Sequence, residues 1–278
     1  MTAASAHTPA LPASLDYPRI KLLAIGDVGV GKSCFIKRYC EGRFVTKYIP
    51  TIGIDFGVKK VEVNRAAVLQ QRSSRPLSSS GRTEKSHAIG GGGPSTIPTA
   101  VRVNFWDGSG DEDYREIRNE FYEAAQGVLL MYDASNAQSF AALENWWEEL
   151  NMYCEGISSA GSSGDQAHGD ASSGGAAAAR NGGKRKSVPT ITGSTAAGKA
   201  VGRTDGRAPV VVLCANKTDD TVVPGAAAPR PRAVSEEQGR AWAREHGCAA
   251  YYETSASTEK NVKEAIEDLV VRVVATFM

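Results

Sequence analysis

The sequence predicts an α/β fold in which five helices flank a six-stranded, mostly parallel sheet, and three observations lead to it. Strand-like apolar segments alternate with helix-like segments along the chain, which is typical of parallel sheets with helices on both faces. Two neighbouring segments, 54–63 and 101–106, alternate apolar and polar side chains. They are expected to form a hairpin that leaves one antiparallel strand at an edge. A glycine-rich turn, residues 26–33, joins the first apolar segment to the first helix-like segment.

The N-terminal part of the chain begins with an Ala-, Ser- and Pro-rich tail, residues 1–17, which we expect to be disordered. The first strand is predicted at 18–25 and the first helix at about 32–40. Gly42 is expected to end this helix, because glycine readily adopts the left-handed conformation that follows many helices. A polar loop then leads to the second strand.

Three low-complexity inserts interrupt the pattern, and we expect no regular structure in them. They are rich in small residues and lie at about 65–99, 155–207 and 221–233. The second contains Lys184-Arg185-Lys186, a weak nuclear-localisation signal that is more typical of a solvated charge cluster. Outside the tail and these inserts, residues 18–278 are predicted to form a single domain.

The later elements continue the alternation. Near-continuous apolar segments indicate strands covered on both faces at 127–133 and 209–215, and a last strand is predicted at 249–254. A charged helix or loop is predicted at 111–124 and a longer helix at 137–153. The final two helices are predicted to begin at a possible capping box, Ser235 to Gln238, and at about Glu259.

Composition excludes some classes of function. The 278 residues include 32 Lys and Arg against 31 Asp and Glu, so charge suggests neither nucleic acid nor a membrane surface as partner. The five cysteines are an odd number without paired metal spacing, which favours reduced cytosolic thiols. No apolar run reaches the length of a spanning helix, and neither Thr2 nor Met278 fits a lipid anchor. We expect a cytoplasmic monomer without a direct lipid anchor, recruited by partners.

The turn at 26–33, Gly-Asp-Val-Gly-Val-Gly-Lys-Ser, has the spacing of a phosphate-binding loop, and its strand–helix setting strengthens that interpretation. Its glycines let successive backbone N–H groups face one anion, and the helix N-terminus adds partial positive charge. Lys32 is expected to reach the outer phosphates and Ser33 to ligate Mg²⁺. The residues expected to contact the nucleotide here are Gly26, Asp27, Val28, Gly29, Val30, Gly31, Lys32, Ser33 and Cys34.

Two tetrapeptides, Asn216-Lys217-Thr218-Asp219 and Glu253-Thr254-Ser255-Ala256, follow predicted strands and resemble the guanine-reading elements of small GTPases. Together with residues 48–56, which resemble a Rab effector strand, they make the chain similar to a Ras-superfamily GTPase of the Rab branch. Finer similarity is to the Rab-like subgroup RBJ or RJL, whose animal members carry a J domain; no J-domain segment is expected in this chain. This similarity rests on residues 36–41, 118–122 and 214–217.

The resemblance implies a P-loop NTPase G-domain that binds GTP or GDP. Asp219 would accept two hydrogen bonds from guanine, a donor pair that adenine lacks. Lys217 would lie along the base, and Asn216 would tie its loop to the phosphate loop. The other implied base contacts are Ser255, which would support Asp219, the Ala256 N–H, which would meet guanine O6, and Phe44, which would pack edge-on to the base.

The resemblance also implies two switch loops that respond to the γ-phosphate. Thr51 would ligate Mg²⁺ only when that phosphate is present, Asp107 would hold Mg²⁺ through water, and the Gly110 N–H would contact the phosphate. Hydrolysis would release both loops. The implied metal ligands are Ser33, Thr51 and Asp107. Effector proteins and exchange factors would bind through two switch regions, Thr46 to Phe56 and Asp107 to Phe121.

Two residues depart from the family pattern, and both predict slow GTP hydrolysis. Asp111 stands where a glutamine usually orients the attacking water, and an ionised aspartate only accepts hydrogen bonds. Val28 places a branched side chain where small residues usually leave room for that glutamine and for an arginine finger. The residues expected to act in hydrolysis are Lys32, Thr51, Gly110 and Asp111. An alternative is that Asp111 acts as a general base.

Three functional hypotheses follow. The leading one is a GTP/GDP switch with weak intrinsic turnover. The second is a GTP-bound scaffold, or pseudo-GTPase, that does not cycle by hydrolysis. A P-loop kinase is disfavoured, because the chain has the guanine-reading elements and lacks a second substrate domain.

Overall fold

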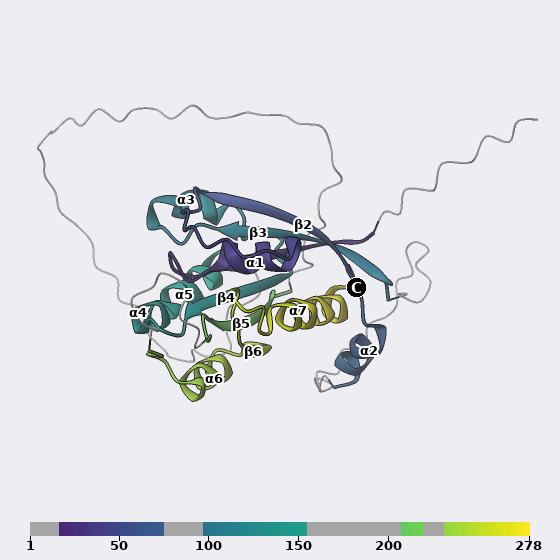
Figure 1. Cartoon of the computed structure of the whole chain (residues 1–278). Coiled ribbons are helices and arrows are strands. Elements are labelled where there is room, and N and C mark those ends of the chain that lie inside the picture. Colours follow the sequence, from purple (N-terminus) through teal and green to yellow (C-terminus); the bar gives the residue numbers. More distant parts are fainter. Residues whose placement is uncertain (1–16, 75–96, 155–206, 220–230) are drawn as a thin grey trace, which may run out of the picture. The chain divides into compact units, whose positions relative to one another are not determined.

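The computed structural model describes residues 17–74, 97–154, 207–219 and 231–278. Within these ranges one sheet forms in the strand order β2-β3-β1-β4-β5-β6 (Figure 1). Its strands are β1 Arg19–Ile25, β2 Ile54–Glu62, β3 Ala100–Gly108, β4 Gly127–Asp133, β5 Val210–Asn216 and β6 Ala250–Glu253. Only β2 runs antiparallel to its neighbour, and it lies at the edge. The predicted six-stranded sheet with one antiparallel edge strand is confirmed.

Helices cover both faces of this sheet. They are α1 Lys32–Glu41, α2 Arg65–Ser73, α3 Arg115–Asn119, α4 Ala137–Ala141, α5 Leu143–Tyr153, α6 Glu236–Glu245 and α7 Val262–Phe277, with a short 3₁₀ turn at Glu112–Tyr114. Alternate strand residues feed two separate cores, as the period of two requires. Leu22, Phe105 and Met131 pack in one core with α1 and α7. Leu23, Leu130 and Tyr132 pack in the other core with α5 and α6.

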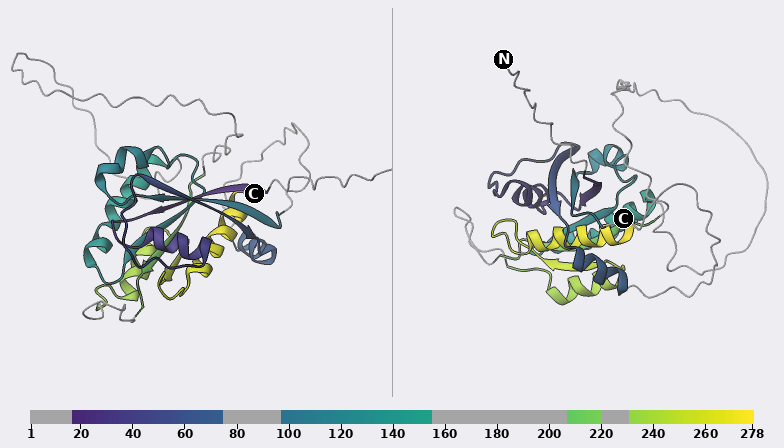
Figure 2. Two further views of the ribbon diagram at one scale, coloured as in Figure 1. Left: turned by 45° about the horizontal axis from the view of Figure 1, so that its top comes forward. Right: turned by 90° about the vertical axis from the view of Figure 1, so that its right-hand side faces the viewer.

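Helix α2 lies inside the first expected insert, so the prediction of no regular structure from 65 to 99 is wrong at its N-terminal end. The Asn64 side chain accepts a hydrogen bond from Ala67 N at 3.1 Å and so caps the helix. Val68 is fully buried where α2 packs beside α7 (Figure 2). Ile97, near the other end of this stretch, is buried in the same core. One buried side chain gives too weak a periodicity to predict a nine-residue helix.

Three other helices differ from their predicted form. The helix expected at 137–153 is divided at Ala142 into α4 and α5, and the segment 111–124 forms the 3₁₀ turn followed by α3. The last helix begins at Val262 rather than at 259, because Glu259 and Asn261 adopt positive φ angles of 71° and 53°. The division at Ala142, together with α2, raises the number of α-helices in the described residues from the five predicted to seven.

The ends of two other helices match the sequence signals. Gly42 takes the left-handed conformation directly after α1, with φ 69°. The capping box of α6 is complete: Gln238 N donates to the Ser235 hydroxyl, and Ser235 N donates to the Gln238 side chain.

An aromatic cluster joins α5 to α6. The Trp242 and His246 rings stack with centroids 3.8 Å apart, and Trp147 meets both edge-on. Glu144 on α5 accepts hydrogen bonds from Trp242 Nε1 at 2.6 Å and contacts His246 Nε2 at 3.2 Å. This cluster fixes α5 against α6 on the face of the sheet away from α1 and α7.

Several predictions fall on residues outside the described ranges, namely 1–16, 75–96, 155–206 and 220–230. They include nearly all of the predicted tail, most of the three inserts and the basic run Lys184-Arg185-Lys186. In the described part of the chain, none of the helices combines the length and apolar character needed to cross a membrane.

Candidate nucleotide site

The phosphate loop lies between the carboxyl end of β1 and the start of α1, where parallel α/β sheets bind ligands. Gly31 has a φ of 102°, and a Cβ there would fall 2.4 Å from Nδ2 of Asn216. Only glycine therefore fits between the loop and β5 at this point. Cys34 lies in the first turn of α1, and burial raises the pKa of its thiol.

Lys32 is buried and lies across the phosphate loop. Its ammonium donates to the carbonyl oxygens of Gly26 at 2.6 Å and Asp27 at 2.9 Å. Burial lowers the pKa of Lys32 to about 8, while the nearby carboxylates of Asp107 and Asp27 act in the opposite direction. The loop thus holds a cation at the place where the sequence predicts a contact with the outer phosphates.

The three predicted metal ligands lie close together: Ser33 comes from α1, Thr51 from the loop that precedes β2, and Asp107 from β3. The hydroxyls of Ser33 and Thr51 are 2.8 Å apart, and the Thr51 hydroxyl donates to Asp107 Oδ2 at 3.5 Å. Burial raises the pKa of Asp107, and its Oδ1 atom is buried without a hydrogen-bond partner in the described structure. A buried carboxylate oxygen beside two hydroxyls fits Mg²⁺, which takes oxygen ligands and often uses only one or two carboxylates.

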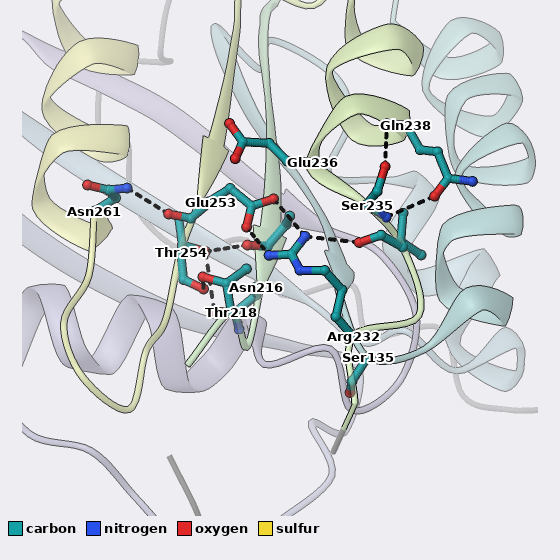
Figure 3. Close-up of polar contacts among 12 residues, drawn as sticks. Ser135, Asn216, Thr218, Arg232, Ser235, Glu236, Gln238, Glu253, Thr254 and Asn261 are labelled. Atoms are coloured by element: carbon teal, nitrogen blue, oxygen red, sulfur yellow. Dashed lines mark hydrogen bonds and ion pairs between the residues drawn. The ribbon is translucent and has the colours of Figure 1, made fainter. Parts of the chain in front are cut away.

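The two predicted base-reading loops are joined to each other and to the phosphate loop. Nδ2 of Asn216 donates to the Val30 carbonyl oxygen at 2.8 Å, which is the tie that the family resemblance implied. Oδ1 of Asn216 accepts from the Thr254 hydroxyl and from Ala256 N, each at 3.3 Å. Thr218 donates through its hydroxyl to the Thr254 carbonyl at 3.0 Å (Figure 3). One buried asparagine thus connects segments from three parts of the chain.

The other predicted base contacts have partners within the fold. The Ser255 hydroxyl and Asp219 Oδ1 are 2.6 Å apart, so Ser255 supports this carboxylate as expected. Lys217 has a positive φ of 61°, and its ammonium forms an ion pair with Asp133 at 2.7 Å. Phe44 is half-buried, and the guanidinium carbon of Arg38 lies over its ring, 5.7 Å from the ring centroid. Their contacts with a base stay predictions.

The second switch loop lies directly on the phosphate loop. A Cβ on Gly110 would fall 2.3 Å from Val28 N and 2.4 Å from the Asp27 carbonyl carbon, so this contact requires glycine. Val28 itself is 51% exposed beside this loop. The Asp111 carboxylate accepts from Asp113 N at 3.1 Å and caps the 3₁₀ turn. Asp111 therefore has a local structural role in addition to the catalytic position that the sequence assigned to it.

Four residues behind this loop were not among the predicted nucleotide or metal contacts, although Arg118 lies in the predicted second switch region. They form a buried group of polar contacts: Arg118 from α3, Tyr122 from the following turn, and Trp146 and Glu149 from α5. In the sequence they resemble ordinary surface charges and core aromatics, and 31 residues separate Arg118 from Glu149. Burial of both charges was the missing signal, and it is visible only once α3 and α5 are folded together.

A polar hollow of about 530 Å³ lies near the base-reading loops. Its charged side chains already pair with each other: Arg232 with Glu253, and Arg240 with Glu236. Asn261 donates to the Glu253 carbonyl oxygen at 2.7 Å. The Asn261 bond holds the segment after β6 against the end of that strand, so we regard the hollow as part of the scaffold around the base-reading loop.

A family model described as "Ras family" matches residues 21–71, 95–167 and 186–275. This chain belongs to the Ras family. The match includes the phosphate loop, both switch segments and both base-reading loops. As a Ras-family small GTPase, the chain is a nucleotide-binding switch of the GTPase class. Members of the family bind GTP and GDP and interact with effectors and exchange factors.

The curated relatives that this chain matches are longer than the part over which they are similar to it. DnaJ homolog subfamily C member 27 of Bos taurus is 30% identical over 256 residues, covering 92% of this chain and 62% of that protein. The protein of the same name from Gallus gallus is 31% identical over 249 residues, covering 90% of this chain and 59% of its own length. That from Homo sapiens is 30% identical over 256 residues. The chain thus spans about three fifths of the relatives' length.

Proposed function

We propose that this chain is a Rab-like GTP/GDP switch with Mg²⁺ as cofactor and slow intrinsic hydrolysis. We place it in the subgroup related to J-domain proteins, because its relatives carry the name DnaJ homolog. The proposal that the chain binds a nucleotide rests on the hydrogen bonds of Asn216, which connect the phosphate loop to both base-reading loops. A ligand that spans phosphates and base would touch all three segments at once.

Guanine selectivity is assigned to Asp219. Its carboxylate is supported by the Ser255 hydroxyl, and it would accept hydrogen bonds from guanine N1–H and the exocyclic amine. Adenine would leave this carboxylate without those donors. A site built to bond donors that the wrong ligand lacks discriminates against that ligand by about 10⁴ or more. Excess ATP that displaced bound GDP would contradict this assignment and favour a P-loop kinase.

Mg²⁺ would be held by Ser33, Thr51 and Asp107, and it would neutralise charge on the outer phosphates. The fit rests on the two adjacent hydroxyls and on the buried Asp107 oxygen described above. Lys32 would bind the same phosphates from the loop, and the Gly110 N–H would contact the γ-phosphate.

Slow hydrolysis follows from Asp111 and Val28. Orienting a water for attack needs a group that accepts and donates, whereas an ionised aspartate only accepts. Its negative charge also opposes a reaction that depends on stabilising negative charge at the phosphates. Because Asp111 caps the 3₁₀ turn, its carboxylate has a competing partner in the Asp113 N–H. A glutamine at this position would keep the acceptor and add a donor.

Single-turnover GTP hydrolysis separates the switch from the pseudo-GTPase. We expect a measurable but slow rate that rises in Asp111→Gln, and rises further when Val28→Gly is added. A wild-type chain that binds GTP but never hydrolyses it would favour the pseudo-GTPase. No increase in either variant would show that our assignment of positions 111 and 28 is wrong. GDP release, measured in parallel, controls for general damage to the site.

Partners are proposed to bind an apolar surface formed by both switch regions. Tyr48, Ile49, Ile52, Phe56 and Ile117 are large apolar side chains that remain at least half or nearly half exposed. Phe56 also begins a row of three aromatic rings. The Trp106 ring centroid lies 4.8 Å from that of Phe56 and 4.9 Å from that of Phe121. Exposed apolar surface of this kind favours protein binding. We further propose a cytoplasmic protein recruited through such partners.

A further inference from the structure

Arg118 holds the second switch loop from behind. Its Nη1 atom donates to the carbonyl oxygens of Ser109 at 2.8 Å and Asp111 at 3.2 Å, the residues on either side of Gly110. The side chain is only 2% exposed. Both bonds are made to the backbone, so they set the position of the Gly110 segment whatever side chains it carries.

The same guanidinium is fixed to α5 by a two-point ion pair. Nε donates to Glu149 Oε1 at 2.7 Å and Nη2 donates to Glu149 Oε2 at 2.9 Å. The Tyr122 hydroxyl donates to Glu149 Oε1 at 2.7 Å. Removing one partner of a buried pair leaves an uncompensated charge, which is strongly unfavourable. Arg118 therefore stays on α5, and the loop is held to α5 through it.

Trp146 continues this connection to the phosphate loop. It lies three residues before Glu149 on α5, so both side chains share one helix face. The Arg118 guanidinium lies 4.4 Å from the Trp146 ring centroid, within the range of a cation–π contact. The indole N–H donates to Asp27 Oδ1 at 2.7 Å. The ring thus contacts Arg118, which bonds to the second switch loop, while the indole N–H contacts the phosphate loop directly.

We propose that Arg118, Glu149, Trp146 and Asp27 form a latch in which Arg118 is the positioning residue for the γ-phosphate contact of Gly110. The proposal rests on the proposed GTP/GDP function. The latch holds the Ser109–Asp111 backbone against the phosphate loop. Withdrawal of the loop requires loss of two hydrogen bonds from a buried cation. The latch therefore favours the loop position that binds GTP and leaves GDP, which lacks the γ-phosphate, largely unaffected.

The test compares dissociation of fluorescent GDP with that of a fluorescent non-hydrolysable GTP analogue from the full chain with Mg²⁺. Arg118→Lys keeps the charge but cannot reach Glu149 and both carbonyls together. We expect the GTP analogue to dissociate about tenfold faster, while GDP dissociation changes by less than about twofold. Trp146→Phe, which removes only the indole N–H and part of the ring, should give a smaller change in the same ratio.

Two further variants keep the test decisive. The double substitution Arg118→Met with Glu149→Met replaces the ion pair by apolar side chains, a change that buried pairs often tolerate without loss of stability. It should reproduce the tenfold effect on the GTP analogue. Arg272→Lys, which alters an arginine–aspartate pair within α7, is the matched control and should leave both rates unchanged.

Equal acceleration of both nucleotides, or no change in either, would overturn the latch and leave Arg118 a structural residue. Those results would leave the proposed function intact, because the wild-type chain would still bind both nucleotides. A wild-type chain that bound neither guanine nucleotide would instead overturn the proposed function itself. The two failures are therefore distinguishable in one set of measurements.

Discussion

The base-reading end and the second switch end of the site are built in different ways. At the base-reading end, short side chains at the ends of β5 and β6 make the contacts: Asn216, the last residue of β5, donates to the Val30 carbonyl oxygen, and the Ser255 hydroxyl donates to Asp219. At the second switch, the loop after β3 is held by charged side chains from α3 and α5. The first end depends on strand termini, and the second depends on helices that sequence spacing does not place.

This difference teaches which kind of change each end tolerates. A substitution at the base-reading end should affect GDP and GTP alike, because both carry the base. A substitution in the latch should affect GTP alone, because only GTP reaches Gly110. The following predictions test that contrast, from the largest expected effect to the smallest.

Asp219→Ala should have the largest effect on binding. It removes the carboxylate assigned to guanine, so GDP affinity should fall by about 10³–10⁴. Wild-type protein should prefer GDP to inosine diphosphate, which lacks the exocyclic amine, and the variant should not distinguish them. Equilibrium titration of both nucleotides measures this. A variant that still prefers GDP would place guanine recognition elsewhere.

Glu149→Gln should lower the free energy of unfolding by about 3 kcal/mol at neutral pH, because it leaves the Arg118 charge uncompensated in the interior. Burial acts to raise the pKa of Glu149, but hydrogen bonds from Arg118 and Tyr122 outweigh it and hold the pKa below the usual 4.5. The folded state therefore gains stability from this carboxylate above pH 4.5, and loses it as the pH falls through the folded-state pKa.

Denaturant unfolding of wild type and Glu149→Gln across pH 3–7 checks this sign. The difference between the two proteins should be constant above pH ~5 and should shrink below the usual value of 4.5. A difference that grows on acidification would contradict the assigned charge state of the pair.

Asn216→Ala should cost about 2 kcal/mol of nucleotide affinity, since it leaves the Val30 carbonyl, the Thr254 hydroxyl and Ala256 N without this partner. GDP and the GTP analogue should both dissociate roughly 30-fold faster. Asn145→Ala, at an exposed position on α5, is the matched control and should change neither rate. Selective loss of the GTP analogue alone would remove the contrast between the two ends.

Val68→Ala should affect stability only. Deleting two buried methyl groups at the α2–α7 contact should lower the free energy of unfolding by about 1.5 kcal/mol. Leu69, the next residue, has a side chain that is 58% exposed. The free energy of unfolding of Leu69→Ala should therefore stay within about 0.5 kcal/mol of that of wild type. Thermal unfolding measures both, and GDP dissociation should be unchanged in each. A change in dissociation would show that α2 is coupled to the site.

The sheet and the base-reading end could be predicted because their signals are local. Each strand is an apolar or alternating segment. Asn216 ends β5 and Ser255 lies two residues after β6, which places them at the same edge. The family resemblance supplied their roles. The resemblance also implied a shared metal site for Ser33, Thr51 and Asp107, and the structure brings their side chains within reach of each other.

The remaining parts could not be predicted, because they depend on contacts between distant elements. Helix α2 is held by α7, which lies almost two hundred residues further along the chain. Arg118 and Glu149 have the composition of solvated helix faces, and only burial distinguishes them. The capping role of Asp111 depends on the local 3₁₀ turn, which no spacing in the sequence signals.

The bond between the Trp146 indole and Asp27 also gives the protein an optical property. Tryptophan emission depends on the partners of the indole, and this indole donates to a carboxylate in the phosphate loop. The chain has four tryptophans, of which Trp147 and Trp242 lie together in the α5–α6 cluster. In a Trp147→Phe, Trp242→Phe background, the remaining tryptophan fluorescence would come from Trp106 and from Trp146, whose indole bonds to the phosphate loop. Nucleotide exchange could then be timed on unlabelled protein with unmodified GTP.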